Sequence, residues 1–289
     1  MHYILKLFLL AFVVVLLFSC DKNGSDSNKK NQEEKLEKII DQFVSKLKKA
    51  EKKTNLSYYK ASIKGTEENW NEYSNNKKKL NKLLSDEDVF KNLDIIKKSG
   101  NISNDTLKRS LIMLYNEMLA NQIDTNKLNK LTDLEAKVES KYSEFRATVG
   151  NKKYSDNEIE AVMDSSTDSE ELEKIWKAHK EIGSFVKSDI LEIVSVRNEI
   201  AKELGFDNFH SMKLKLNEQD PDEIEKLFDE LDSLTKDSFR SMKEEIDQNL
   251  ADIYGIKKSQ LMPWHYQNRY FQEAPQIYEV DLDKYYEDQ

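Results

Sequence analysis

Apolar residues that recur every three or four positions run through most of the chain and predict a series of helices. The first stripe lies in Glu33–Lys53, opposite a strongly charged face, and consists of Leu36, Ile39, Ile40, Phe43, Val44 and Leu47. Residues 57–84 carry a looser stripe that Gly65 interrupts. Further stripes predict helices over about 85–99, 103–122 and 125–149, and glycines stand at the ends of the first and last of these ranges.

The second half of the chain has sharper start and stop signals. Ser155 is followed three residues later by Glu158, which is a capping-box pattern and predicts a short helix over about 155–164. Apolar spacing then predicts one long helix over about 168–204, stopped by a glycine, and a short helix over 208–216. The elements in this half are therefore helices separated by brief connections.

The clearest local signal is the start of the next helix. Asp220 suits the cap, Pro221 the first helical position, and acidic residues fill the first turn. Its stripe consists of Ile224, Leu227, Phe228, Leu231, Leu234, Met242, Ile246, Leu250 and Ile253. This stripe predicts a helix over 221–254, ended by Gly255, about 50 Å long at about 1.5 Å per residue.

An aromatic segment follows Gly255. Residues 263–286 contain Trp264, Tyr266, Tyr270, Phe271, Tyr278, Tyr285 and Tyr286, together with two of the three prolines. Prolines disfavour one uninterrupted helix. The segment is therefore interpreted as an irregular connection packed by its own rings.

Composition supports an all-α fold. Only 7 glycines and 3 prolines occur in 289 residues, which disfavours sandwiches, barrels and doubly wound sheets, because those folds need frequent tight turns. A hydrophobic fraction of 38% excludes a disordered low-complexity chain. The stripes are irregular and lack a fixed repeat, so the expected architecture is a multi-helix globular body rather than a solenoid or a long coiled coil.

Charge and cysteine usage limit the partners. The net charge is −9, and only five of the 45 basic residues are arginines, so nucleic acid is not an expected partner. Cys20 is the single cysteine, which excludes an intrachain disulfide and cysteine-rich metal sites.

The first twenty residues are typical of an export signal. Leu7 to Phe18 form an unbroken apolar run, too short for a spanning helix of about 20 residues. The run ends in Leu17-Phe18-Ser19-Cys20, which resembles the bacterial lipobox and implies a lipid on Cys20. Residues 21–28 are polar, as expected of a flexible tether. We therefore expect a signal peptide over 1–20, a tether over 21–32 and a helical body over 33–289.

This interpretation predicts a bacterial cell-envelope protein, lipid-anchored outside the cytoplasm. Two alternatives remain open at the sequence level. One is an ordinary signal peptide with an incidental cysteine, and the other is an uncleaved anchor.

Common catalytic motifs are absent from the sequence. The histidines are His2, His179, His210 and His265, and no His-Glu-x-x-His occurs. There is also no Gly-x-Ser-x-Gly, no phosphate-binding glycine loop and no dinucleotide fingerprint. The sequence therefore predicts no catalytic residue and no metal ligand within these 289 residues.

One histidine nevertheless stands in a setting that suits ligand contact. His265 lies between Trp264 and Tyr266 on predicted irregular backbone, so these three are candidate cleft-lining residues. The alternative is that they form an aromatic plug that closes the helical core. His179 is expected to be a buried hydrogen-bonding residue and His210 a structural or surface residue.

Three segments carry a family resemblance. They are Trp176-Lys-Ala-His-Lys-Glu-Ile-Gly183, Val196-Arg-Asn-Glu-Ile-Ala-Lys-Glu-Leu-Gly-Phe-Asp-Asn-Phe209 and Met262-Pro-Trp-His-Tyr-Gln-Asn-Arg-Tyr-Phe-Gln-Glu-Ala-Pro275. From about Ser155 to Tyr286 the chain resembles the zinc peptidyl-dipeptidases related to angiotensin-converting enzyme, particularly their bacterial members. The second segment also resembles the neighbouring oligopeptidase family.

The resemblance implies an all-helical body split by a deep cleft, with N-terminal lid helices. It also implies zinc held by a His-Glu-x-x-His helix and a later glutamate, and release of dipeptides from peptide C-termini. Because that motif is missing here, the expectation is an N-terminal half, a truncated product or a fragment, whose zinc ligands lie beyond Gln289. No family catalytic residue is carried over to a numbered position.

Two hypotheses follow from the sequence. The first is the N-terminal portion of a lipid-anchored zinc peptidyl-dipeptidase that binds peptide substrate once a C-terminal half completes it. The second is a non-enzymatic, lipid-tethered helical binding or scaffold protein. Under the first hypothesis we expect exposed apolar surface on the 221–254 helix and the 263–286 segment.

Overall fold

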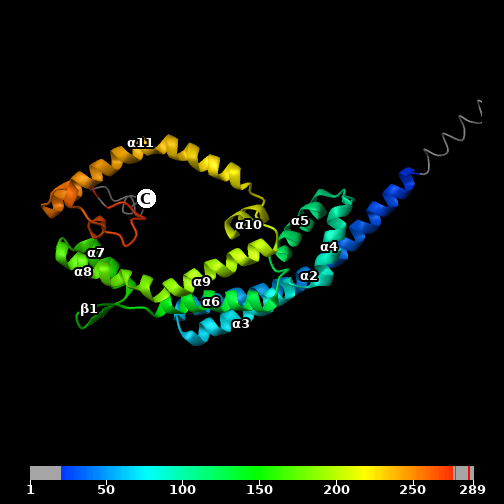
Figure 1. Cartoon of the computed structure of the whole chain (residues 1–289), viewed down its shortest axis with the longest axis horizontal. Helices are drawn as coiled ribbons and strands as arrows, with labels where there is room; N and C mark the ends of the chain where they lie inside the picture. Colours follow the sequence, from blue (N-terminus) through cyan, green and yellow to red (C-terminus); the bar gives the residue numbers. More distant parts are fainter. Residues whose placement is uncertain (1–20, 276, 278–285, 287–289) are drawn as a thin grey trace, which may run out of the picture. The chain divides into compact units, whose positions relative to one another are not determined.

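The computed structural model describes residues 21–275, 277 and 286, with side chains from residue 28 onward. It confirms the all-α prediction, since helices account for nearly all of its regular structure (Figure 1). The chain divides into two compact units, one formed by residues up to 137 together with 193–218, the other by 138–192 together with 219–289.

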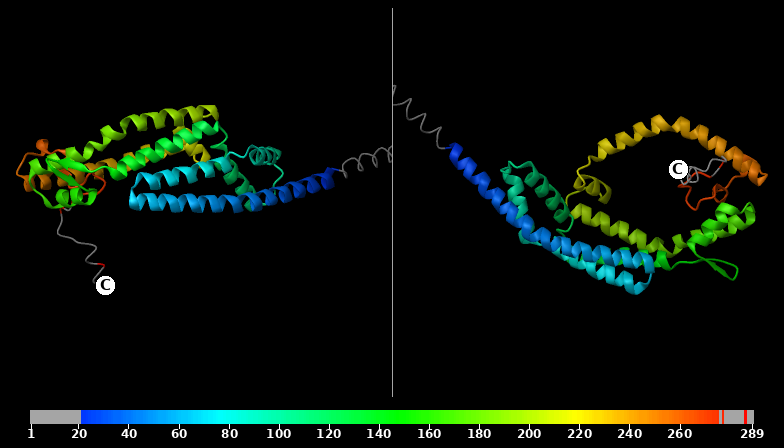
Figure 2. Two further views of the ribbon diagram at one scale, coloured as in Figure 1. Left: turned by 90° about the horizontal axis from the view of Figure 1, so that it is seen from below. Right: turned by 180° about the vertical axis from the view of Figure 1, so that it is seen from behind.

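The first unit is built on an antiparallel helix pair. Helix α2 (Asp21–Lys64) turns at Gly65 into α3 (Glu67–Leu84), and the two lie side by side (Figure 2). Helices α4 (Glu87–Ser99) and α5 (Asp105–Leu119) both pack against α2 and against each other. The buried core consists of Leu36, Phe43, Leu47, Leu80, Leu84, Leu93, Ile96, Ile102, Leu111, Leu114 and Met118. The stripe predicted for α2 is thus confirmed as a buried face.

Two long helices contribute only part of their length to this unit. They are α6 (Thr125–Glu144) and α9 (Ile182–Glu203). Helix α10 (Phe209–Leu216) also belongs to this unit. Ion pairs link the two long helices, Lys127 to Glu203 and Arg197 to Glu135.

The second unit contains the remaining elements. A hairpin of β1 (Ala147–Val149) and β2 (Lys152–Tyr154) precedes α7 (Asp156–Ser165) and α8 (Ser169–Lys180), and α11 (Pro221–Tyr254) follows later. Two 3-10 turns, η1 (Lys258–Gln260) and η2 (Pro263–Tyr266), come after α11. The core of this unit consists of Ala147, Ile159, Met163, Leu172, Ile175 and Trp264.

Capping signals read from the sequence are confirmed in this unit. Both hydrogen bonds of the Ser155–Glu158 capping box are formed. The Asp220 carboxylate accepts from two backbone N–H groups at the start of α11, with Pro221 at the first position. Gly255 ends that helix in the left-handed region, with φ of 63°, which a glycine adopts without the strain of a Cβ.

The helix predicted over 125–149 is too long. It ends at Glu144, and the β-hairpin occupies 147–154, with Gly150 at φ of 60° in its turn. A glycine after a helical pattern predicts a helix end, whereas Gly150 lies in a two-residue turn between β-branched Thr148-Val149 and the second strand.

The single helix predicted over 168–204 is two helices. Helix α8 ends at Lys180, and α9 begins at Ile182, with Gly183 in its first turn. Glycine disfavours a continuous helix. Buried Ile182 and Val186 nevertheless keep the apolar spacing of α8, so the spacing alone does not reveal the break between the two helices.

The polar tether expected over 21–32 is helical in the structure, since α2 begins at Asp21. Extending a formed helix costs far less free energy than nucleating a new one. Apart from Gly24, no helix-breaking residue precedes Glu33. Cys20, His2 and the rest of the expected signal peptide lie outside the described residues. Within the described part, none of the helices combines the length and apolarity needed to cross a bilayer.

Candidate functional site

A cavity of about 450 Å³ lies in the second unit, where the aromatic segment after α11 meets α8. Rings and aliphatic groups form most of its wall, and three cations reach it. The residues that concern its chemistry are Trp176, Tyr266, Tyr270, Lys180, Lys243 and Arg269. An apolar wall with a few convergent charged groups is the usual character of a small-ligand or peptide-side-chain site.

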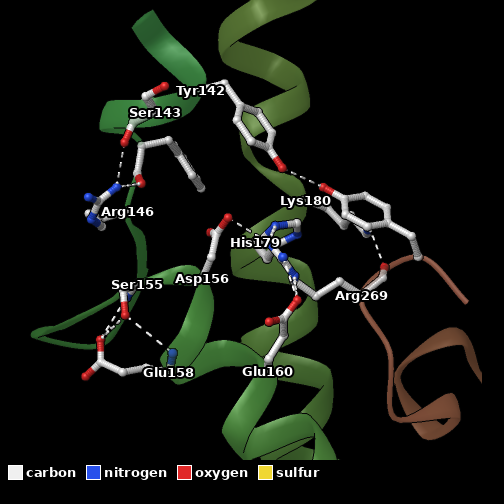
Figure 3. A network of polar contacts seen from close by, with 12 residues as sticks. Tyr142, Ser143, Arg146, Ser155, Asp156, Glu158, Glu160, His179, Lys180 and Arg269 are labelled. Atoms are coloured by element: carbon white, nitrogen blue, oxygen red, sulfur yellow. Dashed lines mark hydrogen bonds and ion pairs between the residues drawn. The ribbon is translucent and has the colours of Figure 1, made fainter. Parts of the chain in front are cut away.

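Arg269 fastens the aromatic segment to α7 (Figure 3). Its Nε and Nη2 donate to Oε1 of Glu160 at 2.9 and 2.6 Å, and its Nη1 pairs with Oδ2 of Asp156 at 2.7 Å. The two acids lie four residues apart and therefore on one face of α7. Burial opposes the charge of Arg269, but the hydrogen bonds that Arg269 donates to Glu160 and Asp156 outweigh the burial and raise the Arg269 pKa.

His179 lies against the same guanidinium and is 2% exposed. Its Nε2 is 3.3 Å from Nη1 of Arg269, and its ring meets the Tyr270 ring at 5.6 Å. Burial, reinforced by the nearby Arg269 charge, lowers the His179 pKa. The neutral imidazole therefore accepts from Arg269, in agreement with the buried hydrogen-bonding role expected from the sequence.

Lys180 supplies a cation without an acidic partner among the described residues. Its Nζ donates to the Arg269 carbonyl oxygen at 2.8 Å and lies 3.9 Å from the centre of the Tyr270 ring. Burial and then the Arg269 charge lower the Lys180 pKa. The group is thus held by a carbonyl and a ring face, and can still pair with an anionic group that enters the cavity.

Tyr266 is held by a closed triangle with α11. Lys243 Nζ donates to the Tyr266 hydroxyl at 2.7 Å, and that hydroxyl donates to Oδ1 of Asp247 at 2.8 Å, while Lys243 also pairs with Asp247. On the other side, the hydroxyls of Tyr270 and Tyr142 lie 3.2 Å apart. Burial, together with this contact, raises the pKa of Tyr270 to about 12, so the phenol stays neutral.

The three residues predicted to line a cleft are separated by the structure. Tyr266 lies at the cavity wall, whereas Trp264 and His265 are buried, with His265 only 1% exposed. His265 Nδ1 accepts from the Met262 N–H at 2.8 Å, and Nε2 lies 2.8 Å from the Ser169 hydroxyl. This geometry matches the aromatic plug that the sequence left open for Trp264 and His265.

Sequence reasoning did not find Arg269, Lys180 or the acids on α7. A signal for Arg269 existed, because the chain uses lysine at nearly every basic position and places an arginine here. The planar guanidinium fork of Arg269 contacts two carboxylates and an imidazole at once. The pairing with Glu160, 109 residues earlier, is not visible in local pattern.

The described residues do not fit a zinc ion. Among them, no group of three His, Cys, Asp or Glu residues is arranged to hold a metal. Both ring nitrogens of His265 have protein partners, and His179 lies against a cationic guanidinium that would repel a divalent ion. His210, at the start of α10, is exposed.

A second cavity of about 600 Å³ lies in the first unit, between α3, α5, α6, α9 and α10. Its wall mixes amides, charges and apolar groups, and the ion pair of Arg109 with Glu218 crosses its edge. The pair is exposed on both sides, so it contributes little to stability.

Comparison with protein families gives a match over residues 30–266 to the peptidase family described as angiotensin-converting enzyme. The matched range covers most of the chain and includes both units. A comparison with curated proteins gave no match.

Proposed function

Because the chain belongs to the angiotensin-converting enzyme family of peptidases, we propose that it forms the zinc-free part of a lipid-anchored peptidyl-dipeptidase. In this proposal the chain helps to hold a peptide, and the zinc ligands come from outside these 289 residues. The completed enzyme releases dipeptides from peptide C-termini, as the family resemblance implies. The observation that carries the proposal is the family match over 30–266 in a region whose described side chains do not fit zinc.

The cavity near Arg269 supports a role in holding peptide. Its aromatic wall suits an apolar side chain, and Lys180 is positioned to pair with a carboxylate or another anionic group. The ion pairs of Arg269 and the triangle around Tyr266 fix the wall in place, because each hydroxyl and guanidinium is held by a neighbouring helix. In this account the residues of the cavity position substrate and do not take part in the chemical step.

The first experiment asks whether the chain alone binds zinc and cleaves peptides. The purified chain is titrated with zinc by calorimetry, and hydrolysis of an internally quenched peptide with a free C-terminal carboxylate is followed with excess zinc. We expect neither a stoichiometric zinc site nor cleavage above the buffer rate. Stoichiometric zinc binding together with release of dipeptides from the peptide would contradict the proposal.

A separate experiment tests substrate holding without hydrolysis. Binding of short peptides with a C-terminal aromatic residue is measured by fluorescence, because Trp176 lines the cavity. Lys180→Gln is expected to weaken binding about tenfold, whereas exposed Lys187→Gln on α9 serves as a matched control. Equal peptide binding by both variants would mean that Lys180 and its cavity do not hold the peptide, and it would favour the scaffold alternative.

The lipid anchor is tested by Cys20→Ala, with Ser19→Ala as the neighbouring control. We expect Cys20→Ala to abolish incorporation of a labelled fatty acid and to move the protein out of the membrane fraction, because the thioether requires the cysteine sulfur. Ser19→Ala keeps a small residue before the cysteine and should keep both. Retained fatty-acid labelling in Cys20→Ala would contradict lipidation at this position.

A further inference from the structure

Helix α11 is exposed to solvent over its N-terminal part and packed against neighbouring residues only toward its C-terminus. Every residue from 225 to 242 is exposed, although the helix continues without interruption to Tyr254. Large apolar residues lie in this stretch, and their exposed fractions range from 43% to 70%: Leu227, Phe228, Leu231, Leu234, Phe239 and Met242. An isolated helix exposed on all sides has no tertiary packing to stabilise it, and packing supplies most helical stability in proteins.

These apolar residues share one face. At about 100° per residue, all six fall within an arc of roughly 140°, and the remaining positions of that arc hold Thr235, Ser238 and half-buried Ile224. The arc between residues 224 and 242 therefore contains no charged residue. We call this arc the open face of α11. It is about 27 Å long at about 1.5 Å per residue, enough for a helix of about 18 residues.

The edges of the open face are acidic. Glu223 and Glu230 lie along one edge, and Glu225 and Asp232 along the other. Residues 222–232 contain six acids and one lysine, Lys226. A partner that covers the face therefore gains by bringing Lys or Arg to both edges, since like charges at these positions would repel.

We propose that the open face of α11 receives an amphipathic helix whose apolar stripe is edged by Lys and Arg, carried by the polypeptide that supplies the zinc ligands. The identity of that polypeptide rests on the proposed function, whereas the chemistry of the docking helix rests on the exposed stripe and its acidic edges. A second copy of this chain is the less suited occupant, because its net charge of −9 would be brought against an already acidic surface.

The test uses two labelled peptides of about 18 residues, a length set by the open face. Both have leucines at alternating spacings of three and four; one has lysines along both edges of the stripe, the other glutamates. Fluorescence anisotropy measures binding of each to the purified chain. We expect the lysine-edged peptide to bind about tenfold more tightly than the glutamate-edged one, and this difference to shrink as salt increases.

Variants locate the binding surface. Leu231→Ser combined with Leu234→Ser changes two exposed residues of the open face and is expected to weaken the lysine-edged peptide about tenfold. Leu191→Ser changes a leucine on α9 whose exposed fraction lies between those of Leu231 and Leu234, and it should leave binding unchanged. Glu225→Lys combined with Glu230→Lys should reverse the preference between the peptides. Equal affinity of the two peptides, or equal weakening by Leu191→Ser, would overturn the proposal.

Sedimentation of the chain alone distinguishes the other occupant. A monomer is expected; a dimer that the Leu231→Ser and Leu234→Ser changes dissociate would overturn the proposal in favour of a second copy. These outcomes are separate from those of the zinc titration. A chain that binds zinc and cleaves peptides but still prefers the lysine-edged peptide would refute the proposed function and keep the docking chemistry.

Discussion

The two ends of α11 carry the same kind of apolar stripe in different surroundings. Toward the C-terminus, Ile246, Leu250 and Ala251 are buried, and η1 packs against the helix. Toward the N-terminus, Leu227, Phe228 and Leu234 are exposed. A periodic stripe therefore shows which face of a helix needs covering, but it does not show whether the described chain covers it.

The largest expected difference between the two ends is in stability. Leu250→Ala removes a fully buried side chain and should lower the free energy of unfolding by about 2–5 kcal/mol. Leu234→Ala, at a position 70% exposed, should change it by less than about 0.5 kcal/mol. Urea unfolding followed by circular dichroism measures both. Similar losses would mean that the open face is packed in solution.

Ion pairs should show the same difference between buried and exposed positions. Arg269→Gln removes the ion pairs of a side chain that is 14% exposed, and we expect a loss of about 1–3 kcal/mol. Arg240→Gln on α11 removes a pair with Asp237 whose members are each more than 70% exposed, and should cost less than about 0.5 kcal/mol. Thermal unfolding of the two variants provides the comparison, and an equal loss would contradict the role given to Arg269.

Two buried histidines of the second unit, His179 on α8 and His265 in η2, make the stability of the chain sensitive to pH. Burial lowers the pKa of His179 and of His265, so the folded state binds fewer protons than the unfolded state as pH falls below the unfolded value of about 6.5. Stability is therefore present above that pH and is lost as pH falls through the lowered pKa values, by at most about 1.4 kcal/mol per pH unit for each proton.

Unfolding measured across this pH range tests the assignment. His265→Gln should reduce the pH dependence, because it removes one of the buried groups. His179→Gln should reduce it as well, because burial also lowers the pKa of that histidine. An unchanged pH dependence in both variants would place the responsible group elsewhere.

The smallest of the four main effects concerns the N-terminal cap of α11. Asp220→Ala removes the carboxylate that accepts from the N–H groups of Asp222 and Glu223, and should cost about 1 kcal/mol. Asp229→Ala, within the exposed stretch and away from the cap, should cost less. Urea unfolding of the two variants, followed by circular dichroism, checks this order, and a larger cost for Asp229→Ala would contradict it.

Sequence reasoning located most helices because their limits are set locally. Asp220 and Ser155 form the caps that their side chains and spacing predict. The hairpin at 147–154 was missed because two three-residue strands are too short for a periodic pattern, and the break at Gly183 was hidden by continuous apolar spacing. Caps and turns can be predicted from neighbouring residues, whereas an element of three residues is too short to show a pattern.

The candidate site was less predictable for a different reason. His265 drew attention through its aromatic neighbours, but its environment is decided by Ser169, which binds its ring from α8. Arg269 acquires its role from Asp156 and Glu160, far away in the sequence. Such pairings are determined by packing between elements, and no spacing rule within one segment reveals them.

Amide hydrogen exchange along α11, read by mass spectrometry on the chain alone and with the lysine-edged peptide, tests the central claim most directly. We predict fast exchange over 225–242 and slow exchange over 246–254 in the chain alone, because only the second stretch packs on a core. The peptide should slow exchange in the first stretch and leave the second unchanged. Equally slow exchange over both stretches without peptide would contradict an open face.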